Sequence, residues 1–278
     1  MMRFKKFFTL LEDVELKDLD GDFVKSALRL KAFTIKSQDL KTTKYKKEIQ
    51  FVVRTTWFPN FDLKDTIAGT KFSKDTHNKL LAKLKKEDPK NAESLIHYPM
   101  SGIGPGEFMF YFMYDEASIG GGASKGIDVS LGNNGAELKS ISVSKTAKGS
   151  IPKGYVSGFF MGGAEDTSKL AGKFADEFAK IGIKSGGSGK GLEFGRKKLA
   201  ELKQKKPAVF KKLEDEFKRV AASYFKTHTV IFINNAKRDA TYGEILHVGP
   251  VNARDVIIDT ITQSSIKPAV KIWDLKSS

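Results

Sequence analysis

Residues 126–143 read GIDVSLGNNGAELKSISV, and this stretch decides the fold that the sequence predicts. From Ile127 to Leu131 apolar and polar side chains alternate, which is typical of a strand, and Ala136 to Val143 predicts a second, returning strand. The sequence between them, Gly132 to Gly135, is rich in glycine and asparagine and favours a tight turn. We therefore expect an antiparallel hairpin.

The predicted hairpin places three charged side chains on one face. With Asn133 and Asn134 at the centre of the turn, facing residues have numbers that sum to 267, so Asp128 lies opposite Lys139 and diagonal to Glu137. Two carboxylates beside a lysine are costly to bring together unless a hard cation binds them, and Mg²⁺ prefers such oxygen ligands. A slip of one residue in the register would move Asp128 to the other face and separate the three side chains.

The residues that precede the hairpin predict a helix. Its glycine-rich approach, GIGPG at residues 102–106, contains Pro105, which is favoured in a first helical turn. We expect the helix to run to about Ala117 and the glycine-rich residues 120–126 to form a loop. Glu107 falls in the first turn, where a carboxylate also compensates the helix dipole.

These segments resemble the PD-(D/E)XK nuclease superfamily, which has the restriction-endonuclease-like fold. That family places an acidic residue on a first helix, an Asp at the start of one strand, and (D/E)-X-K on the next. Glu107 matches the helical acid, Asp128 matches the strand Asp, and Glu137-Leu138-Lys139 matches the third motif. The resemblance covers Gly102 to about Val143, and it departs from many relatives in that Ile127 replaces the proline before Asp128.

The resemblance implies an α/β fold with a restriction-endonuclease-like core, a mixed central sheet flanked by helices. It also implies an endonuclease that hydrolyses DNA phosphodiester bonds with Mg²⁺, or with Mn²⁺ in its place. Glu107, Asp128 and Glu137 would be metal ligands, and Lys139 would be the catalytic lysine that orients the nucleophile or offsets developing charge. The resemblance does not decide whether the substrate is DNA or RNA, or whether the protein forms a homodimer.

The main alternative is a protein of another class: a non-enzymatic DNA-binding component of a virion or nucleoid that keeps the fold without the chemistry. A metal-dependent cleavage assay separates the two.

Positive charge is the strongest feature of the composition. Lysine and arginine number 48 against 33 aspartates and glutamates, a formal net charge of +15. From Lys184 to Lys226 there are 13 Lys or Arg against 5 Asp or Glu, a net charge of +8, which favours a polyanionic partner over simple solubility. Double-stranded DNA is the expected partner. The side chains expected to contact it are Lys190, Arg196, Lys197, Lys198, Lys203, Lys205, Lys206, Lys211 and Lys212.

The pattern along the chain predicts an N-terminal extension over residues 1–45 and a single elaborated α/β domain over residues 46–278. The basic region forms a helical insertion at about residues 165–226. Within the domain, Lys46 to Phe58 alternates and predicts a strand, whereas Asn252 to Thr262 predicts a helix. Ser73 is expected to cap a helix that ends near Asp88, and the helical spacing of apolar residues from Pro207 to Phe225 predicts another helix.

Several classes of site are excluded by composition. The chain has no cysteine, so it has no disulfides, thiolate zinc sites or cysteine nucleophiles. No apolar run reaches the roughly 18 residues that a membrane span needs, and no signal peptide is visible, so we expect no membrane partner and a location in the cytoplasm of a bacterial host.

A second resemblance concerns the N-terminus. MRFKKFF at residues 2–8, followed by Leu10-Leu11-Glu12, resembles the short leaders of proteins packaged into the heads of tailed bacteriophages. In those proteins a prohead protease cuts after Leu-x-Glu. The resemblance implies a component of a phage particle, in the virion interior; the alternative is an ordinary amphipathic helix docked on the domain.

Overall fold

The structure is a computed structural model that describes residues 39–41, 46–98, 102–120, 127–141, 154–157, 159, 161, 165–183, 191–225, 229–237, 239–262 and 265–272. The leader motif, nearly all of the predicted N-terminal extension, and Lys190 lie outside these residues.

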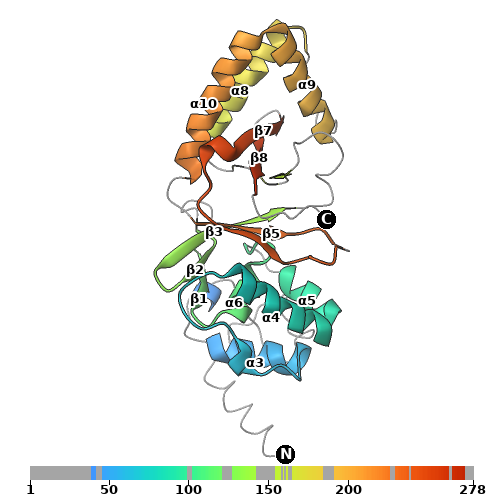
Figure 1. Cartoon of the computed structure of the whole chain (residues 1–278), viewed down its shortest axis with the longest axis vertical. Coiled ribbons are helices and arrows are strands. Elements are labelled where there is room, and N and C mark those ends of the chain that lie inside the picture. The colour runs from blue at the N-terminus through green and yellow to red at the C-terminus, as the bar shows by residue number, and fades with distance from the viewer. Residues whose placement is uncertain are drawn as a thin grey trace, which may run out of the picture. The chain divides into compact units, whose positions relative to one another are not determined.

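The first of two compact units comprises residues 1–138 and 243–245. Its elements, of which Figure 1 labels the α-helices and strands, are η2 (Asp39–Lys41), α3 (Lys46–Trp57), η3 (Leu63–Asp65), α4 (Lys74–Glu87), α5 (Pro89–Ile96), α6 (Glu107–Met113), β1 (Ala117–Ile119), β2 (Val129–Leu131) and the start of β3 (Asn134–Ile141). Every residue from Phe108 to Met113 is buried, so α6 is the apolar centre of this unit.

The second unit comprises residues 139–242 and 246–278. Its elements are the end of β3, then β4 (Tyr155–Ser157), α8 (Glu165–Lys180), α9 (Gly191–Lys205), α10 (Pro207–Phe225), β5 (Thr229–Asn234), most of β6 (Ile245–Gly249), η4 (Ala253–Asp255), β7 (Val256–Ile261) and β8 (Ile266–Lys271). The three long helices fill the range predicted for the helical insertion. The prediction of one elaborated domain over residues 46–278 stays a prediction.

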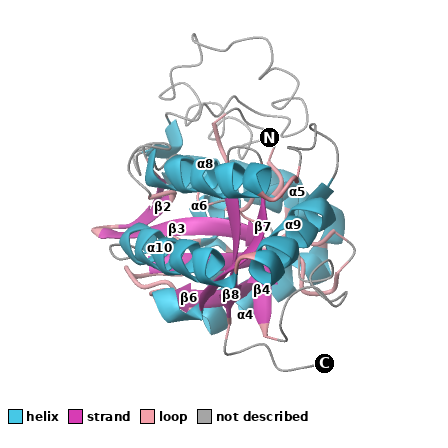
Figure 2. Ribbon diagram, turned by 90° about the horizontal axis from the view of Figure 1, so that it is seen from above, coloured by secondary structure: helices cyan, strands magenta, loops and turns pink. Residues whose placement is uncertain are grey.

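The described strands form two sheets. The larger has five strands in the order β1-β2-β3-β5-β6, and the smaller has three in the order β4-β8-β7, paired antiparallel. Helices α8, α9 and α10 pack on the smaller sheet, as Figure 2 shows from above (helices cyan, strands magenta). The predicted α/β class is therefore confirmed, whereas the division of the strands into two sheets was not predicted.

Two helices confirm predictions made from caps and spacing. Ser73 is the N-cap of α4, where its hydroxyl accepts a hydrogen bond from the Thr76 N–H, and Asp88 ends that helix. Helix α10 runs from Pro207 to Phe225, as its apolar spacing predicts, and it buries Leu213 and Phe217.

The strand predicted over residues 46–58 is wrong, because these residues form helix α3. The buried side chains of Ile49, Val53 and Trp57 recur every four residues, which is the spacing of a helix face. The alternation of Ile49, Phe51 and Val53 suggested a strand, but packing of the helical face decides the conformation.

Two further predictions are wrong in type or extent. The helix predicted over residues 252–262 is only the short turn η4, followed by strand β7, where Val256, Ile257 and Ile258 favour extended backbone. The helix predicted to reach Ala117 ends at Met113, and residues 117–119 form strand β1.

Candidate functional site

The β2–β3 hairpin exists, but its register differs from the prediction. Val129 pairs with Ala136 and Leu131 pairs with Asn134, so facing residues have numbers that sum to 265, not 267. The turn is centred one residue earlier, where Gly132 has φ +55°, a conformation that glycine adopts without strain. A shift of two in the sum keeps every side chain on its predicted face. The predicted pairing of Asp128 with Lys139 is therefore wrong, but the prediction of a shared face is compatible with this register.

Asp128 lies immediately before β2, where the hairpin ladder is irregular. Its backbone N–H donates to the carbonyl of Ala136 at 2.9 Å, and its carboxylate Oδ2 accepts the N–H of Leu138 at 2.8 Å. The side chain therefore replaces a backbone acceptor. This contact holds the Asp128 carboxylate against the middle residue of the Glu137-Leu138-Lys139 motif.

The two charged residues of that motif lie on β3 in different surroundings. Glu137 is buried, with 5% of its surface exposed, and a buried carboxylate is costly unless charge or hydrogen bonds compensate it. Lys139 is half-buried, and its ammonium lies 5.8 Å from the ring centroid of Tyr224 on α10, within range of a cation–π interaction. Because they are two residues apart on one strand, both side chains leave the same face.

Glu107 lies in the first turn of α6, as predicted, but its carboxylate is engaged locally. Its Oε1 accepts the N–H of Gly104 at 2.8 Å and closes the turn before the helix. Among the described residues, no group of three histidine, aspartate or glutamate side chains is arranged to hold a metal ion. The predicted set of three carboxylate ligands, Glu107, Asp128 and Glu137, is therefore not assembled.

Lys46 and Gln50 on α3 support this region, and the sequence reasoning missed both. The buried ammonium of Lys46 donates to the carbonyls of Tyr111 and, at 2.8 Å, Ala117, and burial lowers the pKa of Lys46 well below its usual value. Gln50 donates to the carbonyl of Phe112 at 2.9 Å. Both side chains bind carbonyls at the end of α6 and the start of β1, a role that a helical interpretation of residues 46–57 would have suggested.

Arg196 has a structural partner, and its predicted contact with DNA stays a prediction. Its guanidinium donates to both carboxylate oxygens of Asp259 on β7, at 2.6 and 3.0 Å, and the Ser157 hydroxyl also donates to Asp259. The Asp259 side chain is fully buried and that of Arg196 is 23% exposed. A bidentate pair of this kind fixes the start of α9 on the smaller sheet.

Several predicted DNA-contacting lysines of α9 and α10 are exposed, and many have carboxylate partners. The pairs are Lys197 with Glu193 at 3.7 Å, Lys205 with Glu201 at 2.6 Å, Lys206 with Glu177 at 3.2 Å, and Lys211 with Asp215 at 2.9 Å. Lys198 lies 4.5 Å from the ring centroid of Phe194, Lys203 lies 5.7 Å from that of Phe210, and Lys212 is exposed. The positive charge of the four paired lysines is thus partly compensated by carboxylates of α8, α9 and α10.

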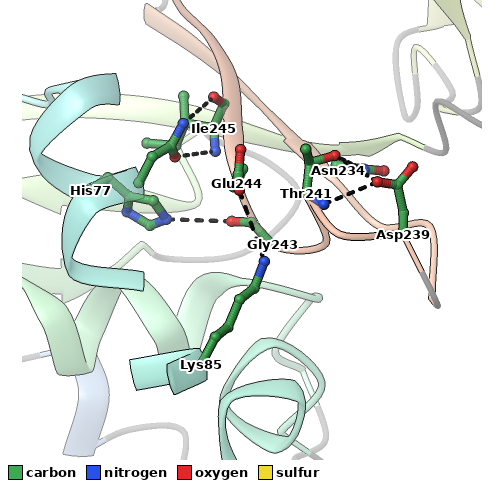
Figure 3. Close-up of polar contacts among 9 residues, drawn as sticks. His77, Lys85, Asn234, Asp239, Thr241, Gly243, Glu244 and Ile245 are labelled. Atoms are coloured by element: carbon green, nitrogen blue, oxygen red, sulfur yellow. Dashed lines mark hydrogen bonds and ion pairs between the residues drawn. The ribbon is translucent and has the colours of Figure 1, made fainter. Parts of the chain in front are cut away.

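A buried polar junction joins α4 to residues 243–245, which belong to the same unit (Figure 3). Asn78 donates to the Ile245 carbonyl at 3.1 Å and accepts the Ile245 N–H at 2.8 Å. His77 Nε2 lies 3.4 Å from the carbonyl of Gly243, and its ring stacks on Phe110 with centroids 4.8 Å apart. Burial is the main cause that lowers the pKa of His77 from its usual 6.5 to about 3; the Gly243 carbonyl opposes this shift and the charge of Lys85 adds to it.

Comparison of the chain with protein-family models, with curated proteins and with solved structures finds no significant match. Within the described part of the chain, none of the helices is both long and apolar enough to cross a membrane.

Proposed function

We propose that this chain is a metal-dependent endodeoxyribonuclease with a restriction-endonuclease-like core, in which Asp128 and Glu137 are the metal ligands. The observation that carries the proposal is the hydrogen bond from the Leu138 N–H to Asp128 Oδ2, at 2.8 Å. It brings one acidic residue to the Glu-x-Lys motif of the neighbouring strand, the juxtaposition on which the resemblance to PD-(D/E)XK nucleases rests.

The order of elements supports the same proposal. Glu107 lies in the first turn of α6, Asp128 lies directly before β2, and Glu137 and Lys139 lie on β3. Strands β2 and β3 are antiparallel neighbours. This is the helix, strand and strand order that the family motif requires.

The donor chemistry fits a hard cation. Mg²⁺ commonly takes only one or two carboxylates and completes its shell with waters and substrate phosphate, so Asp128 and Glu137 suffice without Glu107. When bound, the ion would supply Lewis acidity and a more acidic coordinated water. Lys139 would offset negative charge that develops on the phosphate. Glu107 shapes the turn before α6.

Cleavage of supercoiled plasmid in Mg²⁺, Mn²⁺ or Ca²⁺ tests the proposal. Asp128→Asn and Glu137→Gln keep side-chain shape and should abolish cleavage in Mg²⁺ and Mn²⁺. Lys139→Met should slow the chemical step by about 10²–10³-fold. Asn133→Ala, an exposed change in the same hairpin, is the control and should cleave like the wild type. Wild-type cleavage by Asp128→Asn and Glu137→Gln would exclude this site.

A non-enzymatic DNA-binding protein of a virion or nucleoid is the second candidate. The observation that favours it is the set of exposed lysines on α9 and α10, among them Lys197, Lys203 and Lys212, which need no metal to contact phosphate. It predicts duplex binding with no cleavage under any metal.

A further inference from the structure

Helix α4 exposes a face of lysines in the same unit as Asp128 and Glu137. The opposite face of the helix is buried and consists of His77, Leu80, Leu81 and Leu84. Lys79, Ala82, Lys83 and Lys86 are exposed. At 3.6 residues per turn, Lys83 and Lys86 lie within about 40° of Lys79 around the helix axis, so the three lysines form one narrow stripe.

The charge of this stripe is largely available to a ligand. Within the part of the chain that the structure describes, no ion pair involves Lys79 or Lys86. Lys83 lies 3.3 Å from Asp65, but the two side chains are 63% and 43% exposed, and such surface pairs contribute little. In contrast, Lys205 and Lys211 on α9 and α10 have carboxylate partners within 3 Å.

Carboxylates at the end of α4 are engaged with backbone groups. Glu87 accepts the N–H of Asn60 at 2.8 Å, and Asp88 accepts the N–H of Asn91 at 2.9 Å as the cap of α5. Both carboxylates keep their negative charge, but among the described residues neither forms an ion pair with a lysine of the stripe.

We propose that the α4 lysine stripe, defined as Lys79, Lys83 and Lys86, binds the phosphate backbone of duplex DNA. The stripe spans about 10 Å at a rise of 1.5 Å per residue, and a DNA strand carries one phosphate per roughly 3.4 Å of helix axis. Three lysines therefore match about three phosphates along one strand. Ala82, small and exposed beside them, leaves room for a backbone to approach. The inference rests on the proposed function only in its choice of DNA as the polyanion.

The test measures how DNA binding depends on salt. Binding of a duplex oligonucleotide is titrated in EDTA, where no cleavage occurs, over about 50 to 200 mM NaCl. The triple variant Lys79→Gln, Lys83→Gln, Lys86→Gln should flatten the slope of log K against log salt by about 2.7, so that Kd changes about 40-fold less over this interval. The matched control removes the same charge from exposed lysines on other elements, Lys41→Gln, Lys47→Gln and Lys64→Gln, and should keep the wild-type slope.

Three results would overturn the inference: a wild-type slope in the stripe variant, an equal loss in the control, or retained DNA binding with lost binding to phosphatidylglycerol vesicles. Circular dichroism of each variant checks the fold.

Failure of the nuclease proposal can be distinguished from failure of the stripe proposal, because Asp128→Asn should still bind duplex DNA in EDTA. If the wild type cleaves no DNA but the stripe variant has a flattened slope of log K against log salt, only the nuclease proposal is refuted. Cleavage by the wild type with an unchanged slope would refute only the stripe.

Discussion

Acidification should destabilise this protein through one buried histidine, His77. Its ring is fully buried against the rings of Phe110 and Tyr114, and its Nδ1 makes no hydrogen bond within the described residues. Burial holds the pKa of the folded state at about 3, whereas the unfolded chain titrates near 6.5. Between these values the unfolded state binds the extra proton, so stability must fall as the pH falls from 6.5 towards 3.

The magnitude follows from the two pKa values. A pH of 5 lies 1.5 units below the pKa of His77 in the unfolded chain, so His77 is protonated there, whereas it is still neutral in the folded protein. This difference corresponds to about 2 kcal/mol of lost stability. His77→Phe keeps an aromatic ring against Phe110 and removes the titrating group. All other titrating groups are common to both proteins, so their effects cancel when the two pH profiles are subtracted.

Urea unfolding at pH 7, 6 and 5 measures the effect. The free energy of unfolding of the wild type should fall by about 2 kcal/mol more than that of His77→Phe between pH 7 and pH 5. Parallel profiles for the two proteins would refute the reasoning. So would an NMR titration that places the folded-state pKa of His77 near 6.5.

Two further predictions concern stability. Gly243 has φ +81°, and a Cβ there would lie 2.3 Å from Ile96 Cδ1, so Gly243→Ala should cost about 2–4 kcal/mol in urea unfolding. Gly69→Ala, at φ +95° with no atom within 4 Å, is its control and should cost only about 1–2 kcal/mol. Asp259→Asn should cost about 3 kcal/mol and lower the Tm, because it leaves the largely buried Arg196 guanidinium uncompensated; an unchanged Tm would show that this pair does not fix α9.

The sequence predicted elements whose signals are local. Ser73 and Asp88 mark the ends of α4, and Pro207 marks the start of α10, because a cap or a proline acts within one turn. The error in α3 has a physical cause: the segment carries both an alternating pattern and the four-residue spacing of Ile49, Val53 and Trp57, and packing of that second set decides the conformation. The carbonyls that Lys46 binds lie 65 and 71 residues further along the chain, so the sequence of α3 alone could not identify them.

The candidate site was predicted unevenly for the same reason. Spacing in the hairpin sequence placed Asp128 and Glu137 on neighbouring strands, because alternation and a turn signal are local. The register was missed because Gly132-Asn133 and Asn133-Asn134 both suit a tight turn. The partner of Arg196, 63 residues away, was beyond any pattern of spacing. Charge alone therefore assigned Arg196 to DNA.

The contact between Asp128 and Leu138 also decides which variant tests catalysis. Because the Asp128 carboxylate replaces a backbone acceptor, Asp128→Ala leaves the Leu138 N–H without its partner and should cost about 1–3 kcal/mol of stability. A loss of cleavage in that variant would then have two explanations, partial unfolding and the missing metal ligand. Asp128→Asn keeps an oxygen for the N–H but removes the negative charge, so it should unfold close to the wild-type urea midpoint and still fail to cleave. If Asp128→Ala is as stable as the wild type, this hydrogen bond does not hold the hairpin, and the carboxylate is not fixed at the motif.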